Sequence, residues 1–259
     1  MGLTLETIRD LAVSSEMSPA DMMIGASRRH YFYTGRSNLL SIANILNVRS
    51  GYLSRPRPIR NLLDYGCGYG RVTRWLRAAL PNMELYVTDI DQAAAAWTGE
   101  TFGCQVIDTE LAVDAFDFIW VGSVFTHLSE EVAKALLARL LAALRPHGVL
   151  AITTHGRVRV ARAEGIVWDD PSTKWMSLGL DRPRFEELIA GYHRGYGFVD
   201  YPSQPGYGIT IVPLEWYSRH ALQSSELIQI FCQEKAENHQ DVSAFMKLSL
   251  AANTWGPLY

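Results

Sequence analysis

The sequence predicts an α/β fold with a mostly parallel sheet and helices on both faces of that sheet. Two observations lead to this prediction. Short apolar runs alternate with helical patterns from residue 59 to residue 154, which is typical of right-handed strand–helix–strand units. In addition, residues 116–121 are almost wholly apolar, as expected of a strand that is buried on both faces.

Strands and helices are expected to alternate through this region. The clearest helix has an apolar stripe from Val132 to Leu144, with Ser129 as its N-cap. The segment Pro146–Gly148 is expected to end this helix. The predicted strands cover residues 59–65, 85–89, 105–108, 116–121 and 149–154, and the predicted helices cover residues 72–80, 93–97 and 130–144.

Residues 1–58 are expected to form a helical N-terminal cap, and residues 59–259 the main domain. Ser18-Pro19 predicts a helix start, because proline favours the first helical position. A second helix is predicted to follow Ser37-Asn38. The proline-rich segment 55–58 cannot continue a helix and is predicted to be a linker.

After residue 157 the alternation is less regular, and residues 157–225 are expected to form a substrate-side insertion after the fifth strand. A helix face is predicted at residues 185–192. Residues 197–201 and 208–212 predict a hairpin, because the residues between them are typical of turns. Two further strands, at residues 227–232 and 241–246, are expected to complete the edge of the sheet.

The composition is that of a globular protein that can bury a core, since 48% of the 259 residues are hydrophobic and 20% are charged. A formal net charge of −3 gives no electrostatic basis for gripping nucleic acid or an anionic membrane. The three cysteines are too scattered for a disulfide framework or a zinc site. We expect no metal, no secretory signal and no membrane helix, and therefore a cytoplasmic protein.

Three glycines, Gly66, Gly68 and Gly70, lie between a predicted strand and a predicted helix. Glycines at such a turn let backbone N–H groups and the helix N-terminus approach a ligand closely. Arg71 stands where the G-x-G-x-x-G dinucleotide fingerprint needs its last glycine, which argues against NAD or FAD. Asp89 ends the second predicted strand, where an acid can accept both ribose hydroxyls of an adenosine.

Four segments, taken in order, resemble the motifs of class I S-adenosylmethionine-dependent methyltransferases. The last one is similar to the Leu-x-Pro-Gly-Gly turn of that family, with His147 in place of the first glycine. The resemblance covers about residues 60–155 and implies a Rossmann-like, seven-stranded sheet with S-adenosyl-L-methionine as the cofactor. The four segments are LDYGCGYGR at residues 63–71, VTDID at 87–91, FDFIWVGS at 116–123 and LRPHGVL at 144–150.

The resemblance also implies which residues bind the cofactor. The glycine loop would contact its amino-acid part, Asp89 its ribose, and an acid after the third strand its adenine amine. Asp108 matches that last position, and Glu110 is a rival. Together with Arg36, which lies outside the resemblance, the cofactor-binding candidates are Asp64, Gly66, Cys67, Gly68, Asp89, Ile90, Asp108, Val121, Gly122 and Ser123.

Two residues of these motifs also have a simpler interpretation. Cys67 is interpreted as a small buried side chain and not as a nucleophile, because no base stands beside it in sequence. Asp91 is interpreted as the N-cap of the helix that follows it.

Two histidines are candidate general bases. His127 follows the fourth predicted strand and His155 ends the fifth, so both lie at the edge where open α/β sheets bind ligands. A structural role is the alternative for each of them. In the mechanism that the resemblance implies, such a base would take a proton from a hydroxyl or protonated amine acceptor.

Several aromatic residues outside the resemblance have two interpretations. The segment Tyr31–Arg36 is either a turn that joins two helices or a lid over the cofactor, in which Arg36 pairs with a carboxylate. Tyr207, Trp216 and Tyr217 are either walls of the substrate pocket or core residues.

The predicted function is methyl transfer to an O or N atom of a small-molecule or glycan-type acceptor. Two alternatives stay open: a non-catalytic S-adenosylmethionine-binding protein, and an NAD-dependent oxidoreductase, which Arg71 disfavours. No Asn/Asp-Pro-Pro-aromatic tetrapeptide follows the fourth predicted strand, which ends in residues 122–125 (GSVF). DNA bases are therefore not expected as acceptors, and the sequence does not indicate an oligomeric state.

Overall fold

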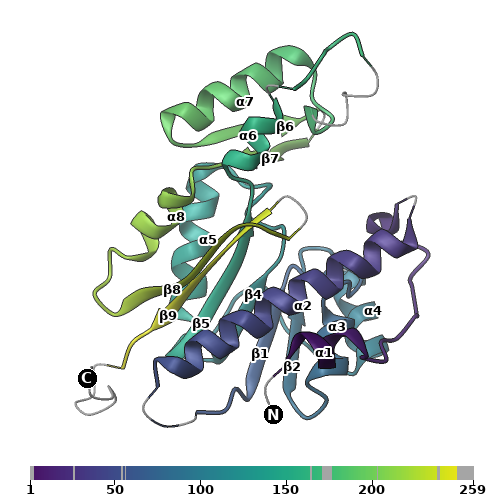
Figure 1. Ribbon diagram of the computed structural model, residues 1–259, viewed down its shortest axis with the longest axis vertical. Helices are drawn as coiled ribbons and strands as arrows, with labels where there is room; N and C mark the ends of the chain where they lie inside the picture. The colour runs from purple at the N-terminus through teal and green to yellow at the C-terminus, as the bar shows by residue number, and fades with distance from the viewer. Residues whose placement is uncertain are drawn as a thin grey trace.

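The computed structural model of the chain describes residues 3–25, 27–53, 55, 57–163, 165–170, 177–202, 204–237 and 240–249. Within these residues, seven strands form one sheet in the order β3-β2-β1-β4-β5-β9-β8 (Figure 1). Neighbouring strands from β3 to β5 are parallel, whereas β9 is antiparallel to both β5 and β8. The strands are β1 (Asn61–Tyr65), β2 (Glu84–Thr88), β3 (Gln105–Val106), β4 (Phe116–Val121), β5 (Leu144–Thr154), β8 (Leu227–Glu237) and β9 (Gln240–Lys247).

This arrangement confirms the predicted Rossmann-like, mostly parallel seven-stranded sheet. The chain builds outward from β1 through β2 to β3, and then returns to place β4 on the other side of β1. The strand order therefore reverses between β1 and β4. In open α/β sheets the carboxyl ends of the strands at such a switch point are where ligands bind.

Helices cover both faces of the sheet. Successive side chains of β4 point to opposite faces, so the strand packs against both layers of helices. Phe118 shares one core with Leu39 and Leu76, which come from α2 (Arg28–Gly51) and α3 (Thr73–Ala79). Ile119 shares a second core with Leu137 and Tyr217. Those residues come from α5 (Glu130–Ala142) and α8 (Leu214–Ala221), and the other helices of the main body are α1 (Leu5–Arg9), η1 (Met22–Ile24) and α4 (Gln92–Phe102).

The N-terminal helices differ from the prediction. No helix starts at Ser18-Pro19; instead η1 follows Asp21, whose carboxylate caps it. The long helix α2 starts at Arg28, with Ser27 as its N-cap, well before the predicted start after residues 37–38. The segment Tyr31–Arg36 therefore lies inside α2, and its interpretation as a turn is wrong.

Gly35 belongs to the segment interpreted as a possible turn, and an isolated glycine weakens a helical pattern. In the structure Gly35 lies inside α2, where that helix crosses the start of α3. A Cβ atom at Gly35 would lie 2.4 Å from the carbonyl oxygen of Arg71 and 2.6 Å from the ring of Trp75. The glycine is therefore required by close packing between the two helices.

The fifth strand starts earlier than predicted. Helix α5 ends at Ala142, and β5 already begins at Leu144, so Pro146–Gly148 lies within the strand. The pairing of β5 with β4 is irregular at this point. His147 has a φ of 66°, which glycine adopts more easily than other residues, and this matches the glycine that His147 replaces in the family turn.

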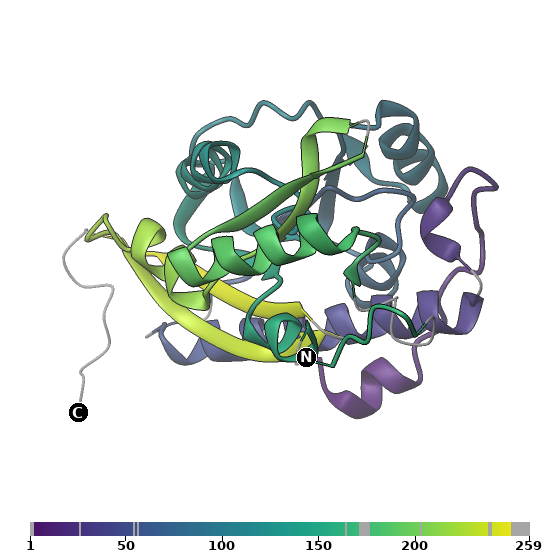
Figure 2. The ribbon, with the colours of Figure 1, turned by 90° about the horizontal axis from the view of Figure 1, so that it is seen from above.

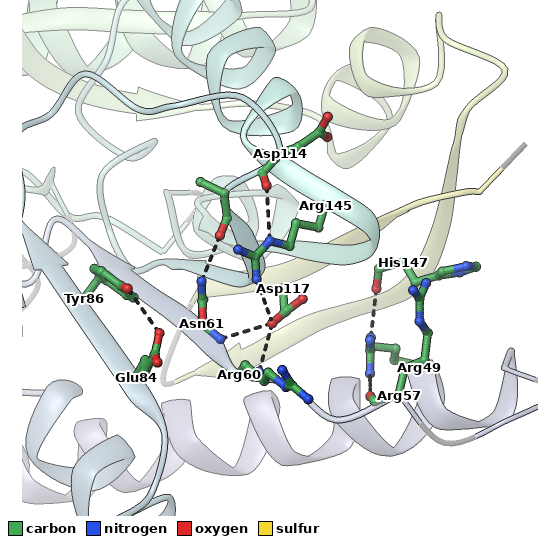
Figure 3. A network of polar contacts seen from close by, with 11 residues as sticks. Arg49, Arg57, Arg60, Asn61, Glu84, Tyr86, Asp114, Asp117, Arg145 and His147 are labelled. Carbon is green, nitrogen blue, oxygen red and sulfur yellow. Dashed lines mark hydrogen bonds and ion pairs between the residues drawn. The ribbon is translucent and has the colours of Figure 1, made fainter.

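A polar network holds the end of the sheet where the parallel strands begin (Figure 3). Asp117 accepts a hydrogen bond from the backbone N–H of Asn61 at 3.1 Å. Arg49, near the C-terminal end of α2, donates to the carbonyl oxygens of His147 and Arg57, both at 2.9 Å. These contacts fix α2 to the sheet at the end opposite the switch point.

The part of the chain from α6 (Arg157–Ala163) to β7 (Gln204–Ile211), called the insertion below, forms a small unit of its own, whereas α8 packs on the sheet. The insertion also contains α7 (Arg182–Arg194) and β6 (Gly197–Tyr201), with β6 and β7 paired as an antiparallel hairpin. The predicted hairpin is confirmed, although β7 begins four residues earlier than expected. Of its predicted turn, residue 203 lies outside the described residues.

This hairpin lies beyond the carboxyl ends of β4 and β5 (Figures 1 and 2). Three backbone N–H groups around β7 donate to the loops that follow those strands. Thr210 donates to Thr126 at 2.8 Å, Gly208 to His127 at 3.3 Å and Val212 to His155 at 2.9 Å. The hairpin is thus attached to both predicted catalytic segments.

Candidate active site

The glycine loop follows β1 and turns three times through backbone conformations that favour glycine. Gly66, Gly68 and Gly70 have φ values of 78°, 50° and 73°, in the left-handed region. A Cβ atom at Gly66 would lie 2.3 Å from Val124, and one at Gly70 would lie 2.3 Å from Phe102. At Gly68 a Cβ atom would meet nothing within 4 Å, so this part of the loop borders open space.

Asp89 joins the loop to the end of β2. Its Oδ2 accepts a hydrogen bond from the backbone N–H of Gly68 at 2.8 Å, and its Oδ1 accepts one from the N–H of Asp91 at 2.9 Å. The N–H of Gly66 donates to the carbonyl oxygen of Thr88 at 2.8 Å. The predicted ribose acid and the predicted loop are therefore brought together at the switch point.

Asp91 has a different part in this region. Its Oδ1 accepts hydrogen bonds from the N–H groups of Ala93 and Ala94, at 3.0 and 3.1 Å. Asp91 is the N-cap of α4, and the interpretation as a cap is confirmed.

Asp64 and Cys67 are both buried beneath the loop. The Asp64 carboxylate accepts a hydrogen bond from the Thr73 hydroxyl at 2.6 Å. Burial raises the pKa of Asp64 to about 6, although the bond from Thr73 opposes that shift. Burial also raises the pKa of the Cys67 thiol, which packs against Val87 and Ala95. An uncharged thiol in such a place favours the interpretation of Cys67 as a packing residue.

The expected adenine side of the site is open. Ile90 is 94% exposed, which is unusual for an isoleucine, and Asp108 is exposed just after β3. Glu110, the rival of Asp108, forms an ion pair with Arg139 at 2.9 Å. Because Glu110 already has a cationic partner, the geometry favours Asp108.

The end of β4 provides the other wall. Val121 is completely buried in the core, whereas Gly122 and Ser123 are half-buried. Ser123 has a φ of 62°, and its N–H donates to the Thr153 hydroxyl at 2.7 Å. The Thr153 hydroxyl and the Ser123 hydroxyl also contact the side chain of Gln240, at 2.6 and 3.1 Å. These bonds hold the backbone at the end of β4.

Helix α2 packs beside the glycine loop. The Tyr31 hydroxyl donates to the carbonyl oxygen of Tyr69 at 3.4 Å, and Arg74 donates to that of Gly70 at 3.1 Å. Arg36 is half-buried in the same part of α2. No hydrogen bond or ion pair joins Arg36 to any other described residue, so its predicted role toward the cofactor stays a prediction.

His127 is held between the β4 loop and the hairpin. Its Nδ1 lies 2.8 Å from the carbonyl oxygen of Gly208. A carbonyl only accepts, so Nδ1 carries the proton, and Nε2 of the neutral ring keeps a free lone pair. The ring stacks on Tyr207 at 5.0 Å between centroids. Burial lowers the pKa of His127, and the bond to Gly208 only partly opposes this, which favours the neutral ring at pH 7.

Of the remaining candidates, His155, Trp216 and Tyr217 are buried, whereas Tyr207 is exposed. His155 is 5% exposed, and its Nδ1 lies 3.2 Å from the carbonyl oxygen of Thr210. Trp216 and Tyr217 are buried in the core beside α5, which favours their interpretation as core residues. Tyr207 is 47% exposed. Burial, and to a smaller extent the negative charge of Asp89, raises the pKa of Tyr207.

Sequence analysis missed two residues of this region. Tyr201 ends β6, and its hydroxyl lies 3.5 Å from Nδ1 of His127. The hairpin prediction already placed Tyr201 next to the turn, and that position was a usable signal. Gln240 starts β9 and reaches Ser123 across 117 positions of sequence. No local pattern could have paired the two.

The residues at the switch point fit an adenosine-containing cofactor. The loop offers backbone beside open space at Gly68, Asp89 is an acid at the end of β2, and the exposed Ile90 offers an apolar surface for an adenine ring. The acid Asp108 follows β3 on the same edge. This arrangement defines a Rossmann-like nucleotide-binding protein.

Comparison with known proteins makes the class more specific. Residues 63–150 match the model of a methyltransferase domain. Human N-terminal Xaa-Pro-Lys N-methyltransferase 1 is 31% identical over 120 residues, which are 42% of this chain and 51% of that protein. The chain thus spans about half the length of this curated relative.

Two solved structures share the fold. A putative S-adenosylmethionine-dependent methyltransferase from Listeria monocytogenes has a TM-score of 0.53 and 10% identity, over 84% of this chain and 99% of its own. A second one, from Mesorhizobium loti, has a TM-score of 0.50 and 13% identity, over 79% of this chain and 96% of its own.

Residues 63–150 thus form a methyltransferase domain, the fold around them is that of S-adenosylmethionine-dependent methyltransferases, and S-adenosyl-L-methionine is the cofactor that this domain implies. The match to this domain favours S-adenosyl-L-methionine over the dinucleotide alternative. In the part of the chain that the structure describes, no helix is both long and apolar enough to span a membrane. Over the same residues, no group of three or more His, Cys, Asp or Glu side chains is arranged to hold a metal ion.

Proposed function

We propose that the chain transfers a methyl group to an O or N atom of an acceptor that lies between the β4 loop and the β6–β7 hairpin. When bound, the cofactor supplies a methyl group that its sulfonium has already activated. The loop backbone at residues 66–68, together with Asp89 and Asp108, would hold it. The protein then has to orient the acceptor, exclude water and remove a proton.

The observation that carries this proposal is the hydrogen bond between His127 and Gly208. It directs Nδ1–H to a backbone carbonyl at 2.8 Å and leaves Nε2 as a proton acceptor. Because the ring is stacked on Tyr207, it is also fixed in orientation. We assign His127 as the general base that accepts the proton of the acceptor hydroxyl or amine. His155 is the second candidate, and its burial makes it less suited to meet a substrate.

The leading acceptor class is a small molecule or glycan-type compound. A second class, the amino group at a peptide N-terminus, is supported by the likeness to the human N-terminal Xaa-Pro-Lys N-methyltransferase. A small molecule and a peptide differ in size and shape, so each would need a different space beside the β6–β7 hairpin. A panel of hydroxylated and amino small molecules, glycans and Xaa-Pro-Lys peptides, offered with labelled cofactor, distinguishes them.

The role of His127 is tested by single-turnover methyl transfer. We expect His127→Gln to lower the rate by about 10²- to 10⁴-fold, as for loss of a general base, while calorimetry shows unchanged cofactor affinity. His193→Gln, on the exposed part of α7, is the matched control and should keep the wild-type rate. A wild-type rate in His127→Gln would remove His127 from the mechanism, and His155→Gln then tests the second candidate.

The non-catalytic alternative has its own outcome. If the protein binds S-adenosylmethionine but methylates no member of the panel, a cofactor-binding role without transfer is favoured. If calorimetry detects no cofactor binding, the proposed function itself fails.

A further inference from the structure

Three arginines are buried among the described residues: Arg49, Arg74 and Arg159, which are 4%, 1% and 8% exposed. Arg49 and Arg74 both donate several hydrogen bonds to backbone carbonyl oxygens. Burying a guanidinium without such partners is costly, because the charge loses its hydration. Hydrogen bonds to the backbone thus explain why Arg49 and Arg74 can be buried, and the burial of Arg159 needs another explanation.

Arg159 has no such partners among the described residues. Its Nε is buried and makes no hydrogen bond, and no described carboxylate forms an ion pair with it. Arg157, on the same helix, is by contrast paired with Glu234. Burial, with the nearby charge of Arg162, lowers the pKa of Arg159 to about 10, so its guanidinium is still charged at pH 7. Within the described part of the chain, the insertion therefore buries a cation that has no ionic partner.

The position of Arg159 relates it to the candidate active site. Helix α6 begins two residues after His155, and the N–H of Arg159 donates to the carbonyl oxygen of Gly156 at 3.0 Å. Val160, the next residue of α6, and Tyr201 pack against the same apolar cluster, and the charge of Arg159 opposes the rise that burial causes in the pKa of Tyr201. The Tyr201 hydroxyl lies 3.5 Å from Nδ1 of His127.

We propose that Arg159 binds an anionic group of the acceptor, a carboxylate or a phosphate, while His127 faces the atom that is methylated. An ionised oxygen group is the partner that a guanidinium pairs with most strongly, through two parallel hydrogen bonds. The aromatic rings of Tyr201 and Tyr207, 5.6 Å apart, would lie along the acceptor between its two ends. This inference rests on the proposed function, since it names the acceptor class of the same site.

The first test measures anion binding without turnover. In protein saturated with S-adenosylhomocysteine, the Nε–H resonance of Arg159 is identified by its loss in Arg159→Gln. We expect this resonance to shift with acetate or with inorganic phosphate at about 10 mM, a range that detects affinities near 1 mM, and not with acetamide. The anion that causes the shift distinguishes carboxylate from phosphate.

Controls separate this inference from the proposed function. Arg157→Gln removes a paired guanidinium from the same helix and should leave the shift in place. If S-adenosylhomocysteine binds but neither anion moves the resonance, the anion site is refuted and the proposed function stands. If S-adenosylhomocysteine does not bind, the proposed function fails first.

The second test distinguishes ligand binding from a structural role. Replacing a buried unpaired charge by an apolar side chain of similar volume is neutral or stabilising, so Arg159→Met should unfold at the wild-type temperature or above it. Arg49→Met leaves two backbone carbonyls without a donor and should unfold at a lower temperature. If Arg159→Met is destabilised as much as Arg49→Met, Arg159 is structural and the proposal is overturned.

Discussion

The folded protein disfavours the charged form of the Asp64 side chain. Asp64 is 2% exposed, and burial raises its pKa to about 6, against about 3.9 in an unfolded chain. The folded protein therefore holds this proton more tightly than the unfolded chain does. The contribution of Asp64 to stability is best below about pH 4 and is lost as the pH rises toward 6.

We accordingly expect Asp64→Asn to be more stable than the wild type at pH 7.5. Each pKa unit is worth about 1.4 kcal/mol, so the gain should be on the order of 3 kcal/mol and should shrink toward zero near pH 4. Denaturant unfolding at several pH values measures it. Glu100→Gln, exposed on α4, is the control. A loss of stability in Asp64→Asn at pH 7.5 would contradict this account.

The pH dependence of transfer is a second prediction at this scale. Burial lowers the pKa of His127 below its usual value near 6.5, and a protonated ring cannot accept a proton. The single-turnover rate should therefore be constant above neutral pH and fall as the pH drops through that lowered pKa. The residual rate of His127→Gln should lack this acid limb. An acid limb that persists in the variant would assign it to another group.

At the scale of elements, the close contact between α2 and α3 restricts how the two helices can lie beside the cofactor loop. Gly35 brings α2 against the carbonyl of Arg71 and the ring of Trp75. The same stretch of α2 contains Tyr31, which contacts the loop at Tyr69. The position of α2 therefore limits where the loop can lie.

Gly35→Ala should reverse the usual effect of this substitution. In a helix interior alanine is normally about 1 kcal/mol better than glycine, but here its Cβ would lie 2.4 Å from a backbone oxygen. We expect a loss of about 2 kcal/mol, typical of overpacking, and weaker S-adenosylhomocysteine binding. Gly51→Ala, at the end of the same helix, has nothing within 4 Å of its Cβ and should not be destabilised. Equal stability of the two variants in urea would refute the contact.

The same elements show what the sequence could predict. The strands of the sheet followed from their apolar runs and from the glycines and prolines between them, because these are local signals. The bounds of β4 were predicted without error. Helix α2 was not, since Gly35 looks like a break unless its contact with Trp75 is known. The irregular start of β5 depends on pairing with β4 and was equally inaccessible.

For the site the division is similar. The loop, Asp89 and His127 were predicted because each lies at the end of a recognisable strand. Arg159, Tyr201 and Gln240 were not, because their roles arise from contacts between distant segments. The partner of His127 is a carbonyl 81 positions away, and no sequence pattern specifies such a bond.

At the scale of the whole molecule, the insertion has a core of its own. Leu188, Val199 and Ile209 form a cluster separate from the two cores of the sheet. A small separate core, attached to the sheet mainly through loops, should open as a unit of lower stability. This would let the hairpin move while the cofactor loop stays in place.

Hydrogen exchange under native conditions tests this division. We expect amides of β6 to exchange faster than those of β4. Leu188→Ala leaves a cavity, which should cost about 2–5 kcal/mol of stability. This variant should accelerate amide exchange in α7 and β6 alone. Leu140→Ala, in the core beside α5, should accelerate exchange in β4 as well. If Leu188→Ala accelerates β4 as much as β6, the insertion and the sheet are a single cooperative unit.

The bond between Ser123 and Gln240 has a consequence for biosynthesis. The end of β4 is fixed by a side chain from β9, and β9 lies between β5 and β8 in the sheet although it is the last strand of the described chain. Residues 61–91, which contain the glycine loop and Asp89, leave the ribosome long before residue 240. The wall opposite that loop takes its final form only after residue 240 has emerged, so a polypeptide halted before β9 would have the cofactor loop without the finished catalytic wall.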